Sequence, residues 1–262
     1  MGLRADESNS ECGAIMKVME YGKQNASVIM LLHGGGLSWW NFRAEAELLS
    51  EKYHVILPVL DGHSNSDADF VSIEENAKRI IEFIDEKYGG SVMLIGGLSL
   101  GGQVLTEILA RRKNVCDFAI IESASIIPSK VTNALIEATV SPSYGLIQQR
   151  WFSRYQFKYL KINQDLFEDY YKDSCKISKI NTISFLKAST SYEVNESIKN
   201  TEAKVRIVVG QKEQRAILKS AQILHEMINA SNLEIKAGLY HGEYSLNQPK
   251  QYVEELLKMI SE

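Results

Sequence analysis

Six short apolar runs recur along this chain of 262 residues, and they limit the folds that it can adopt. Each run has the length of a β-strand and is apolar along nearly all of that length. Strands of this kind belong in a parallel sheet that is covered on both faces. The runs are Val28–Leu32, Val55–Leu57, Val92–Ile95, Phe118–Ile121, Val205–Val209 and Leu233–Ile235.

Amphipathic segments lie between these runs. Ser72–Glu75 has the pattern of a helix capping box, and apolar side chains follow it on one helical face until Gly89. A second helix is predicted from Leu100 to about Arg112, and the last helix begins near Pro249. This alternation predicts an α/β fold with a doubly wound, mostly parallel sheet.

The stretch 126–204 interrupts the alternation. It contains no strong strand run, and it has helical patches such as Leu160–Tyr171. A stretch of roughly 80 residues is too long for a bare connection inside a compact domain. We therefore expect a helical insertion at 126–204 in an α/β core of residues 16–125 and 205–262, preceded by a flexible tail at 1–15.

Composition indicates a folded protein with no electrostatic preference for polyanions. Apolar residues make up 45% of the chain and charged residues 24%, which is usual for globular proteins. The net charge of −4 gives no attraction to nucleic acid or to an anionic membrane. No apolar run approaches the ~20 residues that span a bilayer. We expect a small-molecule substrate, with no nucleic-acid or membrane partner.

The N-terminus and the cysteines favour a cytoplasmic protein. The first ten residues are polar and lack the apolar stretch of a signal peptide. Cys12, Cys116 and Cys175 are widely spaced, so neither a disulfide framework nor a zinc site is expected. We expect no metal and no cofactor, and the sequence leaves the oligomeric state open.

The sequence Gly97-Leu98-Ser99-Leu100-Gly101 matches the pattern Gly-x-Ser-x-Gly. The pattern alone occurs by chance in about one chain in ten of this length. Here it follows an apolar strand and precedes a helix, as a nucleophile elbow requires. Ser99 would then lie at a helix N-terminus, whose dipole favours a developing negative charge. The alternative is a passive serine in a glycine-rich turn.

Glycines also follow the first strong strand, in His33-Gly34-Gly35-Gly36. The backbone N–H of Leu100 and one from Gly35 or Gly36 could form an oxyanion hole. His33 is expected to be structural and to fix this turn. The alternative for the loop is a tight turn without a ligand.

His241 is the predicted general base, because a serine hydroxyl needs an adjacent base and imidazole suits neutral pH. It follows the last strand and precedes the last helix. His225 falls within a predicted helix, His54 opens a strand and His63 lies in a turn. Only His33 shares the strand-end position of His241, and it comes too early in the chain.

The third member of a triad should be an acid at a strand end between Ser99 and His241. Glu213 follows Val205–Val209, and we expect it to orient His241. The alternative for Glu213 is a solvated loop carboxylate. Glu122, at the end of the preceding strand, is the rival acid and is expected to be structural.

Aromatic side chains suggest where a substrate binds. Trp39 and Trp40 adjoin the predicted oxyanion loop His33–Gly36, and Tyr144 and Trp151 belong to the insertion. Apolar pockets with few polar groups suit small or medium acyl and alcohol groups, so we expect these four residues to line one. For any single aromatic in the insertion, packing within the insertion is the alternative.

Together these motifs resemble the α/β-hydrolase superfamily over nearly all of the chain from about Met16. Asp61–Ser66 resembles the family's Gly-His-Gly-x-Ser turn, with Ser64 in place of a glycine. The order serine, acid, histidine matches, and the insertion falls where the family places its helical cap. The departure is Glu213, since the family usually has Asp.

The resemblance implies a serine hydrolase that cleaves a small-molecule ester through an acyl-enzyme on Ser99. A serine nucleophile excludes the related dehalogenases and epoxide hydrolases, which use Asp. Carboxylesterase, thioesterase, lipase, C–C hydrolase and aminopeptidase activities remain, and fold does not choose among them. A ligand-sensing or signalling protein with slow turnover, or a lyase, is the alternative from another class.

Overall fold

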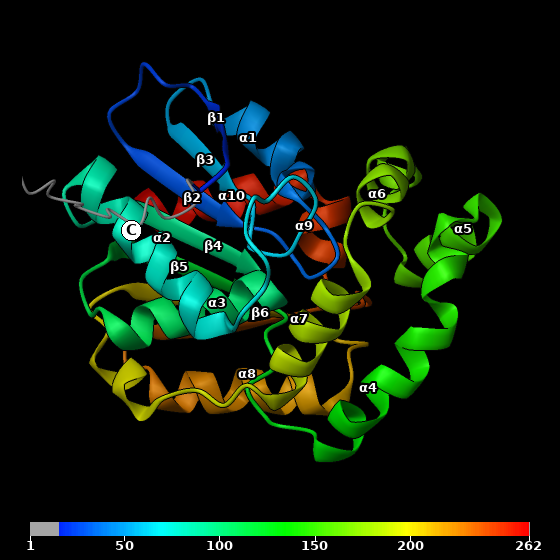
Figure 1. Cartoon of the computed structure of the whole chain (residues 1–262). Helices are drawn as coiled ribbons and strands as arrows, with labels where there is room; N and C mark the ends of the chain where they lie inside the picture. Colours follow the sequence, from blue (N-terminus) through cyan, green and yellow to red (C-terminus); the bar gives the residue numbers. More distant parts are fainter. Residues whose placement is uncertain (1–15, 262) are drawn as a thin grey trace, which may run out of the picture.

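The computed structural model of the protein describes residues 16–261. Within this range, the strands form one sheet in the order β1-β3-β2-β4-β5-β6-β7 (Figure 1). β1 pairs antiparallel with β3, and the remaining pairs are parallel. The strands are β1 (Val18–Tyr21), β2 (Val28–Leu32), β3 (His54–Pro58), β4 (Val92–Leu98), β5 (Cys116–Glu122), β6 (Lys204–Gly210) and β7 (Ser231–Lys236).

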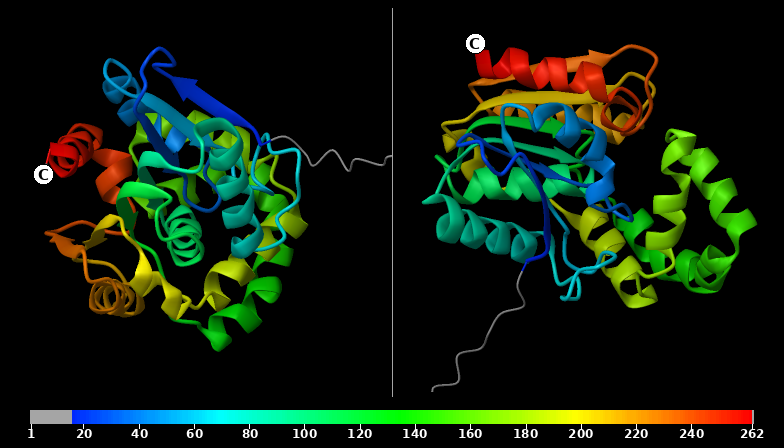
Figure 2. Two further views of the ribbon diagram at one scale, coloured as in Figure 1. Left: turned by 90° about the vertical axis from the view of Figure 1, so that its left-hand side faces the viewer. Right: turned by 90° about the horizontal axis from the view of Figure 1, so that it is seen from above.

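Helices cover both faces of the sheet (Figures 1 and 2). Successive side chains of a strand point to opposite faces, so Met30 of β2 joins one core and Leu31 the other. The core on the Met30 side includes α2 (Ile73–Tyr88), α3 (Leu100–Arg111) and α8 (Arg215–Met227). The core on the Leu31 side includes α1 (Arg43–Leu49) and α10 (Pro249–Ser261). The predicted doubly wound, mostly parallel sheet is confirmed.

The ends of α2 follow the chemistry of its sequence. The Ser72 hydroxyl accepts a hydrogen bond from the backbone N–H of Glu75 at 3.1 Å. At the other end, Gly89 adopts φ +68°, a left-handed conformation that favours glycine. Both predicted helix signals are therefore correct.

All elements described between β5 and β6 are helical. The elements are α4 (Lys130–Ser143), η2 (Tyr144–Gln148), α5 (Arg150–Leu160), η3 (Gln164–Leu166), α6 (Phe167–Ser174), α7 (Lys179–Ser191) and η4 (Glu196–Asn200). We call α4–α7 the cap helices. The predicted continuous patch Leu160–Tyr171 is wrong, because α5 ends at Leu160 and Lys161 takes a left-handed φ of +58°.

Buried hydrogen bonds attach the cap helices to the core through α6. The carboxylate of Asp173 accepts one hydrogen bond from Trp40 Nε1 at 2.9 Å and another from Ser64 Oγ at 2.7 Å. Asp173 is buried, so both bonds are shielded from water. In Figures 1 and 2, α4 and α5 stand away from the sheet, with α6 and α7 between them and the core.

The strand order places a crevice at the ends of β2 and β4. The chain passes from β2 to β3 on one side, and then crosses to β4 on the other side of β2. In open α/β sheets, ligands bind at the carboxyl ends of the strands where this order reverses. The loop after β2 contains Gly34–Gly36, and the turn after β4 contains Ser99.

Candidate active site

Ser99 occupies a strained turn between β4 and α3. Its φ of +53° and ψ of −111° lie in a region of backbone conformation that residues other than glycine rarely adopt. A Cβ on Gly97 would lie 2.3 Å from the carbonyl oxygen of Gly101, and one on Gly101 would lie 2.2 Å from that of Leu32. The two glycines of the pentapeptide are therefore required by backbone packing around the turn.

A chain of hydrogen bonds joins Ser99, His241 and Glu213. His241 Nε2 lies 2.9 Å from Ser99 Oγ, and its Nδ1 lies 2.8 Å from Glu213 Oε2. Glu213 follows β6, and His241 lies between β7 and α9 (Glu243–Asn247). Both distances are within the range in which a base activates a hydroxyl and a carboxylate orients the base.

The carboxylate of Glu213 is held by three donors. Its side chain has no exposed surface, and Oε1 accepts hydrogen bonds from Ser123 Oγ at 2.6 Å and from the Gly210 N–H at 2.8 Å. Burial acts to raise the pKa of Glu213, but the bonds from His241, Ser123 and Gly210 outweigh it and hold the pKa below its ordinary value. The group is thus an ionised carboxylate facing the imidazole.

Glu122, the rival acid, makes a different contact. Its Oε1 accepts the backbone N–H of Ser245 at 3.3 Å, and its side chain is buried. Burial raises the pKa of Glu122 to about 7, and repulsion from Glu213 acts in the same direction. The hydrogen bond to His241 therefore comes from Glu213, while Glu122 supports α9.

The backbones of Leu100 and Gly35 approach each other beside Ser99. Leu100 is the first residue of α3, so its N–H has no acceptor within the helix. A Cβ built on Gly35 would lie 3.5 Å from Leu100 Cβ, which shows that the two backbones approach closely. Gly36 has φ +73°, and Asn41 Oδ1 accepts the N–H of Gly34 at 3.1 Å, which fixes the loop.

The buried His33 side chain fixes this loop through hydrogen bonds to the backbone. Its Nε2 accepts the backbone N–H of Leu60 at 3.1 Å, so the proton resides on Nδ1, which donates to the Gly34 carbonyl at 2.9 Å. Burial lowers the pKa of His33 to about 3, so the ring stays neutral. This is the structural role expected for His33.

A small apolar cavity opens at Ser99. Its volume is about 80 Å³. Leucine and isoleucine side chains supply most of its wall, and the polar groups are those of Ser99 and His241. The cavity is lined by Gly34, Gly35, Leu37, Leu98, Ser99, Leu160, Ile162, His241, Gly242 and Leu246.

Comparison with known proteins identifies the family. The sequence profile described as "Alpha/beta hydrolase family" matches residues 29–225, which is most of the chain. The chain belongs to the alpha/beta hydrolase family. The resemblance expected from the motifs is thereby confirmed.

Solved structures of other hydrolases share this fold. An esterase from Exiguobacterium antarcticum has a TM-score of 0.78 at 19% identity, with 94% of this chain and 96% of that chain covered. An enol-lactonase from Burkholderia xenovorans has a TM-score of 0.78 at 13% identity, covering 96% and 98%. A meta-cleavage product hydrolase from Pseudomonas fluorescens has a TM-score of 0.74 at 18% identity, covering 95% of each. At these identities the likeness is one of fold.

The four aromatic residues expected to line the pocket of this alpha/beta hydrolase lie outside the cavity. Trp40 is buried against Asp173, and Trp39 packs beside the Arg43 guanidinium. The Tyr144 hydroxyl donates to the Ile177 carbonyl. Trp151 is 67% exposed on α5. Aliphatic residues distant from one another in sequence form the wall instead, and no local pattern marks them.

Phe185 of α7 is a neighbour of the site that the sequence did not indicate. A Cβ on Gly35 would lie 3.4 Å from its ring, and the ring stacks on His63 at 4.8 Å between centroids. The sequence did not indicate this contact because Phe185 lies on a cap helix, about 150 residues beyond the loop that it contacts. Phe185 therefore packs beside the glycine-rich loop of this hydrolase.

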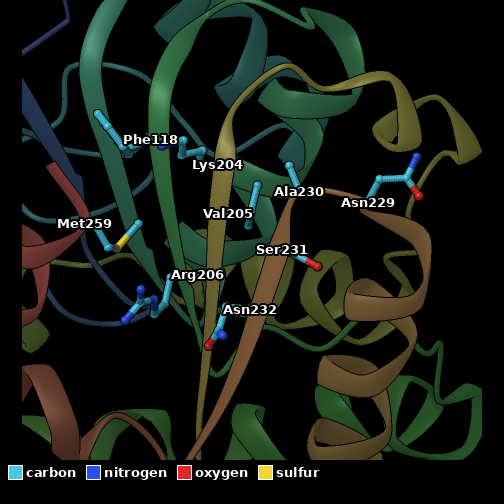
Figure 3. Close-up of a pocket in the computed structure, with 9 residues that line it drawn as sticks. All are labelled: Phe118, Lys204, Val205, Arg206, Asn229, Ala230, Ser231, Asn232 and Met259. Carbon is cyan, nitrogen blue, oxygen red and sulfur yellow. The ribbon is translucent and has the colours of Figure 1, made fainter. Parts of the chain in front are cut away.

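A larger hollow of about 250 Å³ lies at the opposite ends of the strands (Figure 3). Its wall includes Lys204 and Ser231, the first residues of β6 and β7. Ligands of open α/β sheets gather at the carboxyl ends of the strands, which is where the cavity at Ser99 lies. Within residues 16–261, no cluster of three or more His, Cys, Asp or Glu side chains could hold a metal ion.

Proposed function

We propose that this hydrolase cleaves a small carboxylic ester through an acyl-enzyme on Ser99. The observation that carries the proposal is the unbroken hydrogen-bonded chain from Glu213 through His241 to Ser99. It ends at an apolar cavity lined by Gly35, whose backbone lies close to that of Leu100. These are the parts that acyl transfer requires: a nucleophile, a base, an orienting acid and donors for the oxyanion.

Each residue has a defined role in the first half of the reaction. His241 Nε2 takes the Ser99 hydroxyl proton as Oγ bonds to the ester carbonyl carbon. The carbonyl oxygen becomes an oxyanion, which the N–H groups of Leu100 and of Gly35 or Gly36 stabilise. Glu213 fixes the imidazole and stabilises its positive charge. When the intermediate collapses, His241 returns the proton to the departing alcohol.

Water completes the reaction. His241 removes a proton from the water as its oxygen bonds to the acyl carbon. The second tetrahedral intermediate then expels Ser99 Oγ, which regains its proton from His241. The products are a carboxylic acid and an alcohol, and the enzyme is restored.

The cavity favours a short acyl group. Its volume of about 80 Å³ holds only a few carbon atoms, and its wall is aliphatic. Esterases are among the proteins that share this fold, including one from Thermogutta terrifontis at a TM-score of 0.78. We therefore expect short-chain esters to be turned over best.

The test is hydrolysis of p-nitrophenyl acetate, butyrate and octanoate by the wild type, Ser99→Ala and a control serine variant. Ser91→Ala is the control, because Ser91 is exposed at the other end of β4. We expect Ser99→Ala to lose activity by ~10⁶ and Ser91→Ala to match the wild type. Full activity in Ser99→Ala would refute the proposal.

The same panel separates the alternatives. A fluorophosphonate probe should label Ser99, and an acyl-enzyme should be visible by mass spectrometry. Labelling with turnover slower than about one per minute would favour a ligand-sensing protein instead. Higher kcat/KM on acyl thioesters than on the matched oxygen esters would indicate a thioesterase. Turnover of a vinylogous diketone without ester cleavage would indicate a C–C hydrolase.

A further inference from the structure

Exposed apolar side chains are concentrated in the segment that contains the cap helices. Thirteen large apolar side chains are exposed among residues 16–261, and eight of them lie between positions 131 and 180. Single exposed apolar residues are ordinary, but a cluster of them marks a contact surface. The eight are Val131, Leu135, Leu146, Trp151, Tyr155, Tyr159, Leu160 and Ile180.

Three of these form a stripe along α5. Trp151, Tyr155 and Tyr159 are 67%, 69% and 81% exposed, and residues four apart lie on one side of a helix. Phe157, on the opposite side, is fully buried against Phe167 of α6. We call Trp151, Tyr155 and Tyr159 the aromatic stripe. Packing of the cap helices against one another does not account for it.

The stripe is flanked by positive charge. The segment Arg150–Lys161 contains four basic residues and no Asp or Glu, in a chain whose net charge is −4. Arg150 pairs with Glu168 of α6, and the Arg154 guanidinium lies over the Phe167 ring of α6, although Arg154, like Lys158, is exposed. The expectation of no membrane partner rested on the net charge of the whole chain. That net charge does not reflect the local positive charge of α5.

The stripe leads to the cavity. Leu160 ends α5, and it lines the cavity together with Ile162 and Ser99. The Lys161 ammonium lies 3.7 Å from the centre of the Tyr240 ring, next to His241 in sequence. A surface bound along α5 would therefore adjoin the mouth of the cavity, and α5 stands on the outer side of the cap helices (Figure 1).

We infer that α5 docks on an anionic lipid surface and that the enzyme takes an ester-bearing amphiphile from that surface. Trp and Tyr rings favour the headgroup region of a bilayer, and basic residues beside them are attracted to anionic lipids. A second copy of the chain fits less well, because two α5 helices would bring like charges together. The docking proposal does not depend on the proposed function, whereas the substrate class rests on the proposed ester hydrolysis.

The test is co-sedimentation of the full chain with vesicles of equal parts phosphatidylglycerol and phosphatidylcholine, beside vesicles of phosphatidylcholine alone. Each basic residue near an anionic surface strengthens binding by roughly fivefold. We therefore expect at least about tenfold tighter binding to the mixed vesicles, weakened by high salt. Equal binding to both kinds of vesicle, or binding to neither, would overturn the inference.

Matched variants assign the binding to α5. The triple variant Trp151→Ser, Tyr155→Ser, Tyr159→Ser should weaken vesicle binding at least about tenfold. The control is Val71→Ser, Ile235→Ser, Leu257→Ser, which removes three exposed apolar side chains elsewhere and should bind as the wild type does. Lys158→Glu should also weaken binding. Equal binding by the two triple variants would contradict the inference.

Two further measurements separate docking from catalysis. Ser99→Ala should bind vesicles as the wild type does, whatever becomes of its activity. The stripe variant should hydrolyse p-nitrophenyl acetate in solution at the wild-type rate, but lose turnover of a short-chain phosphatidylglycerol presented in vesicles. A stripe variant that loses self-association in light scattering and binds vesicles normally would assign the stripe to a second copy and overturn the inference.

Discussion

A hydrogen bond of 2.6 Å joins the Ser123 hydroxyl to Oε1 of Glu213, so the end of β5 holds the carboxylate that meets His241. The N–H of Gly210 binds the same oxygen, which leaves Oε2 for the imidazole. Ser123 has a left-handed φ of +56° directly after β5. The ends of β5 and β6 thus hold the Glu213 carboxylate in the orientation that places Oε2 against His241.

Glu213→Gln should lower kcat by ~10⁴ with little loss of stability. The amide oxygen can keep the bonds from Ser123 and Gly210, which places the NH₂ group against His241 Nδ1. That donor forces the proton of the imidazole onto Nε2, so His241 no longer accepts the proton of Ser99. The measurement is kcat on p-nitrophenyl acetate together with a thermal melt.

Glu122→Gln is the matched control for that experiment. Its amide oxygen can still accept the N–H of Ser245, and the side chain has no hydrogen bond to His241 among the described residues. We expect less than about a fivefold change in kcat. An inactive Glu122→Gln beside an active Glu213→Gln would place the acid on the other strand.

The backbone strain at Ser99 predicts that glycine at this position gives a more stable protein than alanine does. Both Ser99→Gly and Ser99→Ala remove the hydroxyl group, but only glycine adopts φ +53° and ψ −111° without strain. A strained residue of this kind costs about 1–3 kcal/mol. We expect Ser99→Gly to exceed Ser99→Ala by about 1 kcal/mol in unfolding free energy, measured with urea. Equal values would show that the turn stores no strain.

Local patterns were sufficient to predict the parallel strands β2–β7 and the three polar residues that the structure joins. Continuous apolar runs mark the central strands, and glycines that cannot carry a Cβ mark the turn at Ser99. β1 was missed because it has only four residues, is half exposed and has no apolar run. Ser123 and Phe185 were missed because each acts on a group far away in sequence, and such contacts depend on the folded arrangement.

Buried imidazoles should destabilise the protein in acid. Burial lowers the pKa of His63 to about 4, so below pH 6.5 the unfolded chain takes up a proton that the folded chain does not. The free energy of unfolding therefore falls as the pH drops from 6.5 toward 4, by about 2 kcal/mol at pH 5 for this ring. His63→Phe keeps the stacking on Phe185, and it should reduce the loss between pH 7 and 5 by that amount in urea unfolding. An unchanged loss would mean that His63 is protonated in the native state.

Glu122 should act with the opposite sign. Burial raises its pKa to about 7, so the folded state prefers the protonated acid. Its contribution to stability is complete below about pH 4.5 and is lost as the pH rises through 7, a difference of about 3 kcal/mol. Glu122→Gln should flatten the decline in unfolding free energy between pH 5 and 8. A decline as steep as that of the wild type would assign the effect to another group.

The cavity wall should set acyl-chain preference. Leu37 lines the cavity and is nearly buried, so Leu37→Ala enlarges the space beside Ser99. Each additional buried methylene is worth roughly 0.8 kcal/mol, or about fourfold in kcat/KM. We expect the ratio of kcat/KM for p-nitrophenyl hexanoate to that for acetate to rise at least fourfold. The ratio does not depend on the folded fraction, so any loss of stability leaves the test valid, and an unchanged ratio would place the acyl group elsewhere.

The two buried bonds of Asp173 divide the motions available around the active site. Release of α6 requires that the Asp173 carboxylate lose its hydrogen bonds from both Trp40 and Ser64. Amide protons of α6 should therefore exchange with water only in rare large openings. α4 has Ile136 as its one buried residue, and its amides can exchange through frequent local unfolding. The cap helices therefore combine one segment, α4, that opens often with another, α6, that opens only rarely.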